Sequence, residues 1–440
     1  MRYIANTNAD RREMLAAIGR SSLDELFQDI PQTVRERFAS VGLPAHSEVD
    51  VARRFEQWAA DNPASTLTPF IGGGIYDHYA PAIVRHLAGR SEFYTAYTPY
   101  QPEMSQGTLT GMFEFQTILC ELTGMEIANA SMYDSATATA EAVLMADRIR
   151  GFGRIAVSQG LFAHVRRVVD TYCWAAGMQR VDLPLDADGR TVLAEPVGDV
   201  SAVVVQTPNA FGVIETLEGV KAAIGDALLV VSADPIALAL LEPPGAFGAD
   251  VVTGEGQALG LPMAFGGPLL GLFATRKEYL RQMPGRVAGR TVDVHGETGY
   301  TMAAQTREQH IRRERATSNI CTNSALCALT ATIYVAALGA EGLQAVASQS
   351  LEKAHYLAEQ IARLPGFTVP FGSHFFSEFA VCTEEPAAAV AKRAREAGFL
   401  IGAPAELAGL AEHGALRIAV TERRTREQMD QLVDVLGGGA

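Results

Sequence analysis

The chain has 440 residues, a hydrophobic fraction of 48% and a formal net charge of −14 at neutral pH. This length accommodates two or three domains of a soluble globular protein, and the negative charge argues against a general nucleic-acid-binding protein. No uninterrupted apolar window of about 18 residues occurs, and the first residues lack the pattern of a secretion signal or transit peptide, so we predict a cytoplasmic protein without a membrane-spanning helix.

The first 60 residues have the apolar spacing of helices. Residues 8–10 predict the cap of a first helix, Ser22 opens a second, and a third extends from about residue 48 to residue 60. In the third helix, Val51, Phe55 and Trp58 are spaced to lie on one face.

Two unusual segments follow. Three consecutive glycines at positions 72–74 indicate close backbone approach or positive φ angles. The segment 93–106 contains two prolines and three tyrosines and predicts an ordered loop at an interface or an active-site wall, with a buried packing loop as the alternative. A helix over 109–122 follows, ended by Gly124.

Strands and helices alternate between residues 125 and 275. Alternation of apolar, β-branched strands with helices is typical of a mostly parallel sheet covered by helices. The expected helices follow Ser131 and extend over two further segments, 162–177 and 217–225. The expected strands are 154–158, 178–185, 200–209, 227–235, 249–254 and 269–276.

The remaining residues predict a polar helix over 302–319 and a strongly apolar helix over 325–338. Helices over 351–364, 386–397 and 425–436, mixed with three strand-like runs, indicate a small α+β domain. We therefore divide the chain into a helical segment (1–90), a large α/β domain (91–325) and a small α+β domain (326–440).

Cysteine and lysine usage limits the chemistry. The five cysteines form no pair or Cys/His set with metal-ligand spacing, which predicts reduced thiols and no metal site. Lysine occurs at only four positions: Lys221, Lys277, Lys353 and Lys392.

One acidic residue lies where a cofactor would need it. Asp234 ends a predicted strand, and a further strand leads to the loop that contains Gln257. In pyridoxal-phosphate enzymes of the aminotransferase type, such an acid pairs with the pyridinium nitrogen, and a lysine of the later loop holds the cofactor covalently. Here no lysine lies in that loop. Alternatively, Asp234 caps a helix that begins at Pro235.

Two polar segments remain open between a functional and a structural interpretation. The segment 131–137 opens a helix and would bind an anion through free backbone N–H groups, or would be capped by Asp134 or Ser135. The arginine-rich segment 305–319 would contact carboxylate or phosphate groups at an interface, or would form a solvated charged helix face.

Four long motifs resemble one known family. FIGGGIYDHYAPAIVRHL, YTAYTPYQPEMSQGTLTGMFEFQTILCELTGM, GEGQALGLPMAFGGPLLGLFAT and REQHIRRERATSNICTN are similar to the glycine cleavage system P-protein. The resemblance extends from about residue 1 to residue 435. The length and the missing lysine resemble subunit 1, the N-terminal half of the form that bacteria split into two subunits.

The resemblance implies an aminotransferase-type (fold type I) large domain and a shared activity. With subunit 2, which carries the pyridoxal-phosphate lysine, the chain would decarboxylate glycine, release CO2 and transfer the aminomethyl group to the lipoyl arm of the H-protein. Two copies of each subunit would form a heterotetramer.

The resemblance also assigns residue roles. The loop residues expected at the shared active site are Tyr97, Thr98, Tyr100, Gln101 and Glu103. Supporting or interface roles are expected for Ser105, Gln106, Arg312, Arg313, Thr317, Ser318 and Asn319. Asp234 and Gln257 correspond to the cofactor's acid and lysine positions. Two alternatives stay open: a catalytically silent scaffold that stabilises subunit 2, and an autonomous enzyme that uses Lys277.

Overall fold

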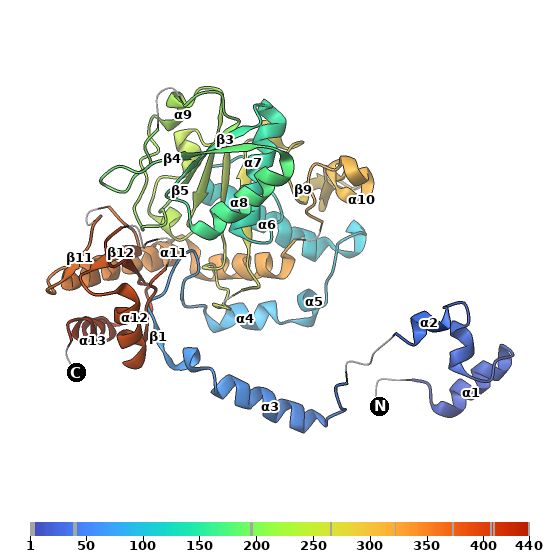
Figure 1. The fold of residues 1–440 in the computed structure, drawn as a ribbon. Coiled ribbons are helices and arrows are strands. Elements are labelled where there is room, and N and C mark those ends of the chain that lie inside the picture. The colour runs from blue at the N-terminus through green and yellow to red at the C-terminus, as the bar shows by residue number, and fades with distance from the viewer. Residues whose placement is uncertain are drawn as a thin grey trace. The chain divides into compact units, whose positions relative to one another are not determined.

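A computed structural model describes residues 5–37, 42–193, 197–264, 266–321, 323–371, 374–404, 407 and 410–438 (Figure 1). By its internal contacts the chain divides into a first unit, residues 1–65, and a second unit, residues 66–440. The division into three domains made from the sequence stays a prediction.

The first unit is helical, as predicted. It contains α1 (Asn8–Ala17), α2 (Gln32–Arg35) and α3 (Glu48–Ala60). The cap of α1 is Thr7 rather than a residue of 8–10, because Thr7 and Asp10 form a reciprocal capping box. Phe55 and Trp58 lie on one face of α3, as their spacing predicted, with ring centroids 5.1 Å apart.

The second unit is built on a seven-stranded sheet. Its spatial order is β2-β8-β7-β6-β5-β3-β4. Strands β4, β3, β5, β6 and β7 are mutually parallel, and β8 pairs antiparallel with both β7 and β2. The bounds are β2 (Ile127–Ala128), β3 (Arg154–Ser158), β4 (Gln179–Leu183), β5 (Ala202–Thr207), β6 (Leu228–Ala233), β7 (Val251–Glu255) and β8 (Gly271–Thr275). The predicted mostly parallel sheet is therefore confirmed.

Helices cover both faces of this sheet (Figure 1). Along β5, Val204 packs with α7 (Ser135–Arg150) and α8 (Ala163–Ala176), whereas Val203 and Val205 face the opposite core. That second core includes α6 (Gln106–Thr123) and the first half of α11 (Ala325–Ile361). Successive strand residues point to opposite faces, so the continuous apolar runs of the sequence reflect burial on both sides.

The polar stretch 302–319 is not the single helix that its sequence predicted. It begins in β10 (Thr298–Ala303), which pairs antiparallel with β9 (Val287–Val292), and then contains only one short α-helix, α10 (Gln309–Arg312). Positive φ angles of 53° at Ala304 and 54° at Arg313 interrupt any longer helix. The charged i,i+4 spacing is a weak local preference, which strand pairing overrides.

The helix predicted over 217–225 is also much shorter in the structure, where α9 spans only Val220–Ala223. Gly219 precedes it with φ of 76°, which is incompatible with a helix that continues through this residue.

The two apolar helices predicted over 325–338 and 351–364 are joined in α11, which Gly339 kinks (φ 65°, ψ −177°). Among helices in the described ranges, only α11 is long and apolar enough to cross a membrane by length and composition. Its side chains instead pack in two protein cores, with Tyr334 beneath the large sheet and Leu357 in the C-terminal part. It is a core helix of a soluble fold.

The C-terminal part is α+β, as predicted. Its antiparallel sheet has the order β11-β12-β14, and a separate parallel pair joins β1 to β13. The elements are β1 (Thr68–Pro69), β11 (Phe367–Thr368), β12 (Glu378–Thr383), β13 (Phe399–Leu400), β14 (Ala415–Ala419), α12 (Ala387–Glu396) and α13 (Arg426–Leu436).

The glycine triplet lets residues 72–79 pass close to this small sheet. A Cβ at Gly72 would overlap the Glu378 carboxylate, and Gly73 and Gly74 have φ angles of 92° and 98°. Both expectations for the triplet are thus confirmed. Past the glycines, the Asp77 carboxylate accepts hydrogen bonds from Arg423 and from Arg424, the latter at 2.7 Å.

Candidate functional site

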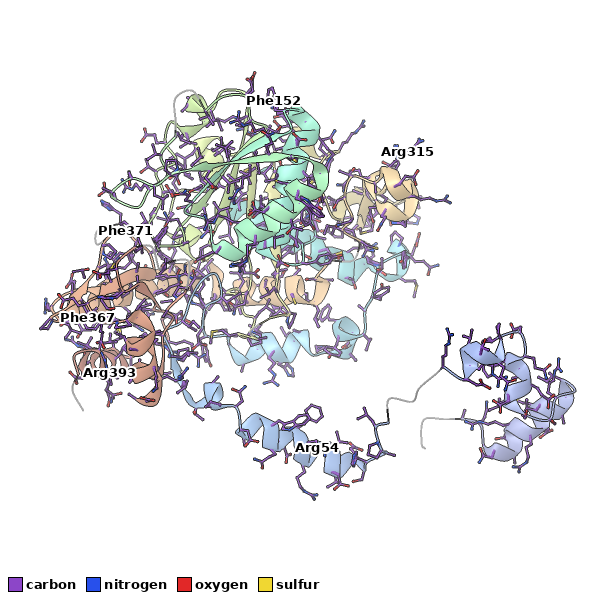
Figure 2. All side chains as sticks on the ribbon, in the orientation of Figure 1. Arg54, Phe152, Arg315, Phe367, Phe371 and Arg393 are labelled. Atoms are coloured by element: carbon purple, nitrogen blue, oxygen red, sulfur yellow. The ribbon has the colours of Figure 1, made fainter. Side chains whose placement is uncertain are left out.

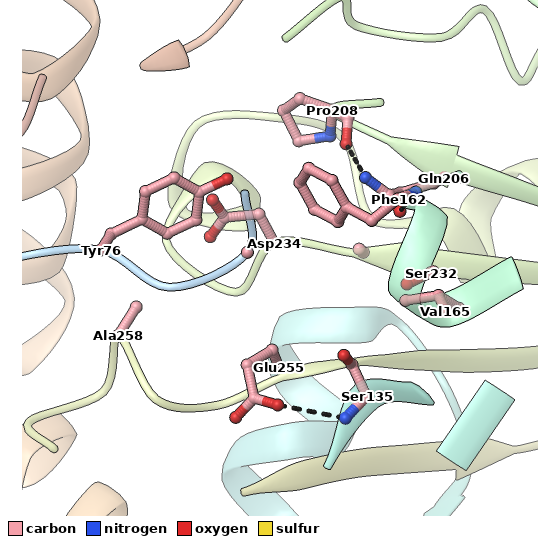
Figure 3. Close-up of a pocket in the computed structure, with 12 residues that line it drawn as sticks. Tyr76, Ser135, Phe162, Val165, Gln206, Pro208, Ser232, Asp234, Glu255 and Ala258 are labelled. Carbon is pink, nitrogen blue, oxygen red and sulfur yellow. Dashed lines mark hydrogen bonds between the residues drawn. The ribbon is translucent and has the colours of Figure 1, made fainter. Parts of the chain in front are cut away.

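A small cavity lies at the carboxyl ends of β5, β6 and β7, the edge where ligands bind in open α/β sheets. We call it the β5–β7 cavity (Figure 3). Its lining includes Tyr76, Ser135, Phe162, Gln206, Asp234 and Glu255. Its volume is about 30 Å³. This space accommodates a few water molecules at most, and a pyridoxal ring with its phosphate is far larger.

Asp234 lies at the cavity, directly after β6, and it also caps the following turn. Its Oδ1 accepts hydrogen bonds from the backbone N–H of Ile236 at 2.8 Å and of Ala237 at 3.5 Å. Asp234 therefore closes a turn, but the helix predicted to begin at Pro235 is absent: a short 3-10 helix begins at Ala237, with Ile236 as its N-cap. Burial raises the pKa of Asp234, and the charge of His78 opposes that rise.

A tyrosine from the glycine-triplet segment stands beside this acid. The Tyr76 ring lies next to the Asp234 carboxylate, and the Phe162 ring lies on the same side of the cavity (Figure 3). Phe162 in turn stacks on His164, with ring centroids 5.6 Å apart. Burial, reinforced by the charges of Glu378 and Asp234, raises the pKa of Tyr76 well above its usual value. A neutral phenol therefore stands beside this acid.

Gln257 locks Tyr76 in this position. Its Nε2 donates to the Tyr76 carbonyl at 3.1 Å and to the Leu261 carbonyl at 2.8 Å, and its Oε1 accepts from the Tyr76 N–H at 2.9 Å. The side chain is 1% exposed. The residue at the lysine position thus serves as a backbone clamp.

None of the four lysines lines the cavity. Lys221 pairs with Asp250 at 2.6 Å, Lys353 donates to the Glu422 carbonyl, and Lys277 and Lys392 are exposed. The position of Lys277 therefore argues against an autonomous enzyme that uses this lysine.

Carboxyl groups also occupy the helix N-terminus where a phosphate would bind. The Ser135 N–H of α7 donates to Glu255 Oε2 at 3.1 Å, and the Thr137 N–H donates to Asp134 Oδ1 at 2.8 Å. The capping interpretation of segment 131–137 is confirmed for Asp134. Acidic groups at this terminus repel an anion. The residues of this chain therefore do not fit pyridoxal phosphate.

Glu255 should make the stability of the chain depend on pH. Burial raises its pKa from 4.5 to about 7, although three backbone N–H groups donate to it. A raised native pKa means that the folded state binds more protons than the unfolded state, so the stabilisation present at low pH is lost as the pH rises to 7. From pH 5.5 to pH 8 the free energy of unfolding should fall by roughly 2 kcal/mol through this group.

Urea titrations of the wild-type chain and of Glu255→Gln at both pH values test this expectation. The variant should lack that part of the pH dependence, because its amide does not titrate. An identical pH dependence in both chains would contradict the assignment.

The loop 93–106 is ordered and lies mainly at the surface. It follows α5 (Ser91–Tyr94) and leads into α6. Pro99 is buried and Thr98 half-buried, whereas Gln101 and Glu103 are exposed. Tyr97 and Tyr100 are each 73% exposed, an unusual state for bulky aromatic side chains that suits a surface awaiting a partner.

Gln106 anchors the end of this loop to β10. Its Nε2 donates to the Tyr300 carbonyl at 2.8 Å and to the Pro102 carbonyl at 2.7 Å, and its Oε1 accepts from the Tyr300 N–H at 2.8 Å. Ser105 contributes its backbone carbonyl to the first turn of α6, without a side-chain cap.

The segment 309–319 separates into an exposed and a packed half. Residues 309–315 are all exposed, and Arg315 projects from the molecule (Figure 2). Arg312 donates to the Thr306 carbonyl at 3.0 Å, and Arg313 has the positive φ described above. Both arginines are therefore placed at the surface.

The packed half holds this segment on the sheet-covering helices. The Thr317 N–H donates to the Arg307 carbonyl at 3.1 Å. Ser318 lies beside Glu141 of α7 and Asn319 beside Tyr172 of α8, and each lowers the pKa of its neighbour against the rise caused by burial. These contacts favour a supporting role.

The predicted residues thus fall into two groups. Asp234 lines the β5–β7 cavity, and Gln257 binds the backbone of Tyr76, which also lines it. The loop 97–106 and the segment 308–319 meet elsewhere, through Arg286. Sequence reasoning missed Arg286, Tyr76 and Glu255. The glycine triplet was the one signal near Tyr76, and nothing in the sequence singled out the other two.

Comparisons with known proteins agree on one family. A model of the glycine cleavage system P-protein matches residues 1–436. The chain is 48% identical over 445 residues to a probable glycine dehydrogenase (decarboxylating) subunit 1 of Chlorobium chlorochromatii, with 99% of each chain covered. It is also 48% identical over 445 residues to the protein of that name from Moorella thermoacetica, with 100% of this chain and 99% of the relative covered.

Solved structures give the same answer. A crystal structure of glycine decarboxylase (P-protein) of the glycine cleavage system, in inhibitor-bound form, matches all of both chains with a TM-score of 0.94 and 43% identity. Glutamate decarboxylase of Lactobacillus brevis matches 93% of this chain and 96% of its own with a TM-score of 0.68, and at 14% identity it shows the fold alone. The predicted fold class is confirmed, and the chain belongs to the glycine cleavage system P-protein family.

Proposed function

We propose that this chain is the non-cofactor-binding half of a glycine decarboxylase, acting with a subunit 2 that carries pyridoxal phosphate. Together they decarboxylate glycine, release CO2 and transfer the aminomethyl group to the lipoyl arm of the H-protein. Bound by the partner, the cofactor supplies the electron sink for the carbanion. The names of the curated relatives, which specify a subunit 1, support the existence of such a partner.

The small β5–β7 cavity is the observation that carries this proposal. Tyr76 fills the ring position, Gln257 replaces the lysine, and Glu255 takes the N–H group at the helix terminus. A chain of this family that excludes the cofactor needs a second chain for the chemistry.

The loop 97–106 is the proposed contribution of this chain to the partner's active site. Its hydroxyl, amide and carboxyl groups, on Tyr97, Tyr100, Gln101 and Glu103, point away from the core and are accessible. A cytoplasmic complex of two copies of each subunit is the proposed assembly.

Reconstitution with and without the partner tests the proposal. The chain alone, its presumed subunit 2 and the mixture are each incubated with pyridoxal phosphate, reduced with borohydride and digested for mass spectrometry. We expect the cofactor on a lysine of the partner, and glycine–CO2 exchange in the mixture alone. A cofactor adduct on a lysine of this chain, when it is incubated without the partner, would contradict the proposal.

A further inference from the structure

The two motif segments meet at one buried arginine, Arg286, which immediately precedes β9. Its Nη1 donates to the Thr98 hydroxyl at 3.2 Å. Its Nε lies 3.7 Å from Oε2 of Glu308, the residue before α10. One guanidinium therefore contacts both the loop 97–106 and the segment 308–319.

This junction is shielded from water. Arg286 is 5% exposed and Glu308 8% exposed. The second oxygen of Glu308, Oε1, has no hydrogen-bond partner among the described residues. The Oε2 of Glu308 has two neighbours, the Arg286 guanidinium and His310 Nδ1, the latter at 3.5 Å. A buried carboxylate with few partners depends on such neighbours, and the pair with Glu308 holds Arg286 while its Nη1 is directed at the loop.

The loop has little other support. Within the described chain, two contacts tie side chains of residues 97–106 to the β9–β10 region: Thr98 to Arg286, and Gln106 to the backbone of Tyr300. Tyr100 and Glu103 lie between these two contacts and are exposed. The Thr98 contact, together with the buried Pro99, therefore positions the N-terminal half of the loop.

We propose that Arg286 is a positioning residue for the shared active site, holding Thr98 so that Tyr100 and Glu103 meet the partner's reaction centre. This inference rests on the proposed function, in which the loop reaches that centre. The planar fork of arginine contacts a hydroxyl and a carboxylate at once, which the single ammonium of lysine reproduces poorly.

The chain offers a matched control in Arg307. It is buried to a similar degree, at 8% exposed, and it binds the same turn of the chain through the carbonyls of Met283 and Gly285. It also donates to the Ala304 carbonyl, and none of these bonds involves the loop. Arg307→Lys should therefore change stability without changing catalysis.

The test measures kcat and KM of glycine–CO2 exchange, and the melting temperature, in the reconstituted complex. Arg286→Lys and Thr98→Val should each lower kcat about tenfold with little change in KM for glycine. The double variant should be no slower than either single one, because both remove the same contact. Thr98→Ser keeps the hydroxyl and should restore the wild-type kcat, and Arg307→Lys should lower only the melting temperature.

Thr98→Val leaves the Arg286–Glu308 pair intact, so it reports on the loop even where Arg286→Lys unfolds the chain. Unchanged kcat in Thr98→Val, or additive losses in the double variant, would overturn the inference. If Tyr100→Phe slows exchange while Thr98→Val does not, this inference alone fails. If neither the Tyr100 nor the Glu103 variant slows exchange, the proposed role of the loop fails with it.

Discussion

Replacing Tyr100 by phenylalanine or Glu103 by glutamine should lower glycine-dependent turnover of the reconstituted complex about 10²-fold, because a displaced group at a reaction centre costs roughly that factor. The melting temperature of the chain should stay unchanged. Both side chains are exposed, and substitutions at such positions leave stability nearly unaltered. Steady-state exchange assays and thermal melts of each complex measure the two quantities.

Matched exposed residues outside residues 97–106 serve as controls. Tyr94→Phe changes a tyrosine that is 66% exposed on α5, and Glu121→Gln changes an exposed carboxylate on α6. Both should retain wild-type turnover. Normal turnover in the Tyr100 and Glu103 variants, with an intact complex, would instead favour a catalytically silent scaffold that stabilises the partner.

Replacing Arg417 by methionine should lower the free energy of unfolding by about 3–5 kcal/mol. Its Nε lies 3.3 Å from Oε1 of Glu378, and the two side chains are 7% and 4% exposed. It also donates to the Ala210 carbonyl at 2.9 Å, while Glu378 accepts from the Gly73 N–H at 2.6 Å. The pair joins the small sheet to the glycine-triplet segment that carries Tyr76, and its loss would leave a buried carboxylate without its cation.

A double variant separates the charge from the packing. In Arg417→Met with Glu378→Met, neither charge is buried, so most of the lost stability should return, as for other buried ion pairs replaced by apolar residues. Chemical denaturation of the wild type, the single variant and the double variant measures these differences. A loss below about 1 kcal/mol in Arg417→Met would show that the pair behaves like a surface ion pair.

Local sequence patterns correctly predicted the helix ends and the buried strands. Gly124 and Gly177 end α6 and α8 in the left-handed conformation, as predicted, because glycine adopts that conformation without steric cost. The apolar runs at β5 and β6 correctly predicted buried parallel strands, because a strand covered by helices on both faces needs apolar residues at every position. The family motifs added the fold type, and the missing lysine is a property of the sequence itself.

Local patterns failed where distant contacts competed with them. The stretch 302–319 has helical charge spacing, yet pairing of β10 with β9 and the bonds of Arg307 to the carbonyls of residues 283–285 hold it in other conformations. The apolar stripe of α3 was correctly predicted, but no periodicity states what covers such a stripe.

The sequence by itself determined that no lysine lies in the loop that contains Gln257. Only the tertiary structure decided what lines the β5–β7 cavity, because Gln257 holds Tyr76 from 181 residues away and Glu255 reaches the Ser135 N–H across 120 residues. It likewise decided that Arg286 joins Thr98, 188 residues earlier in the chain, to Glu308. Such contacts form because the sheet brings strand ends and loops that are distant in the sequence close together in space. The local spacing of residues does not reveal which distant segments will meet.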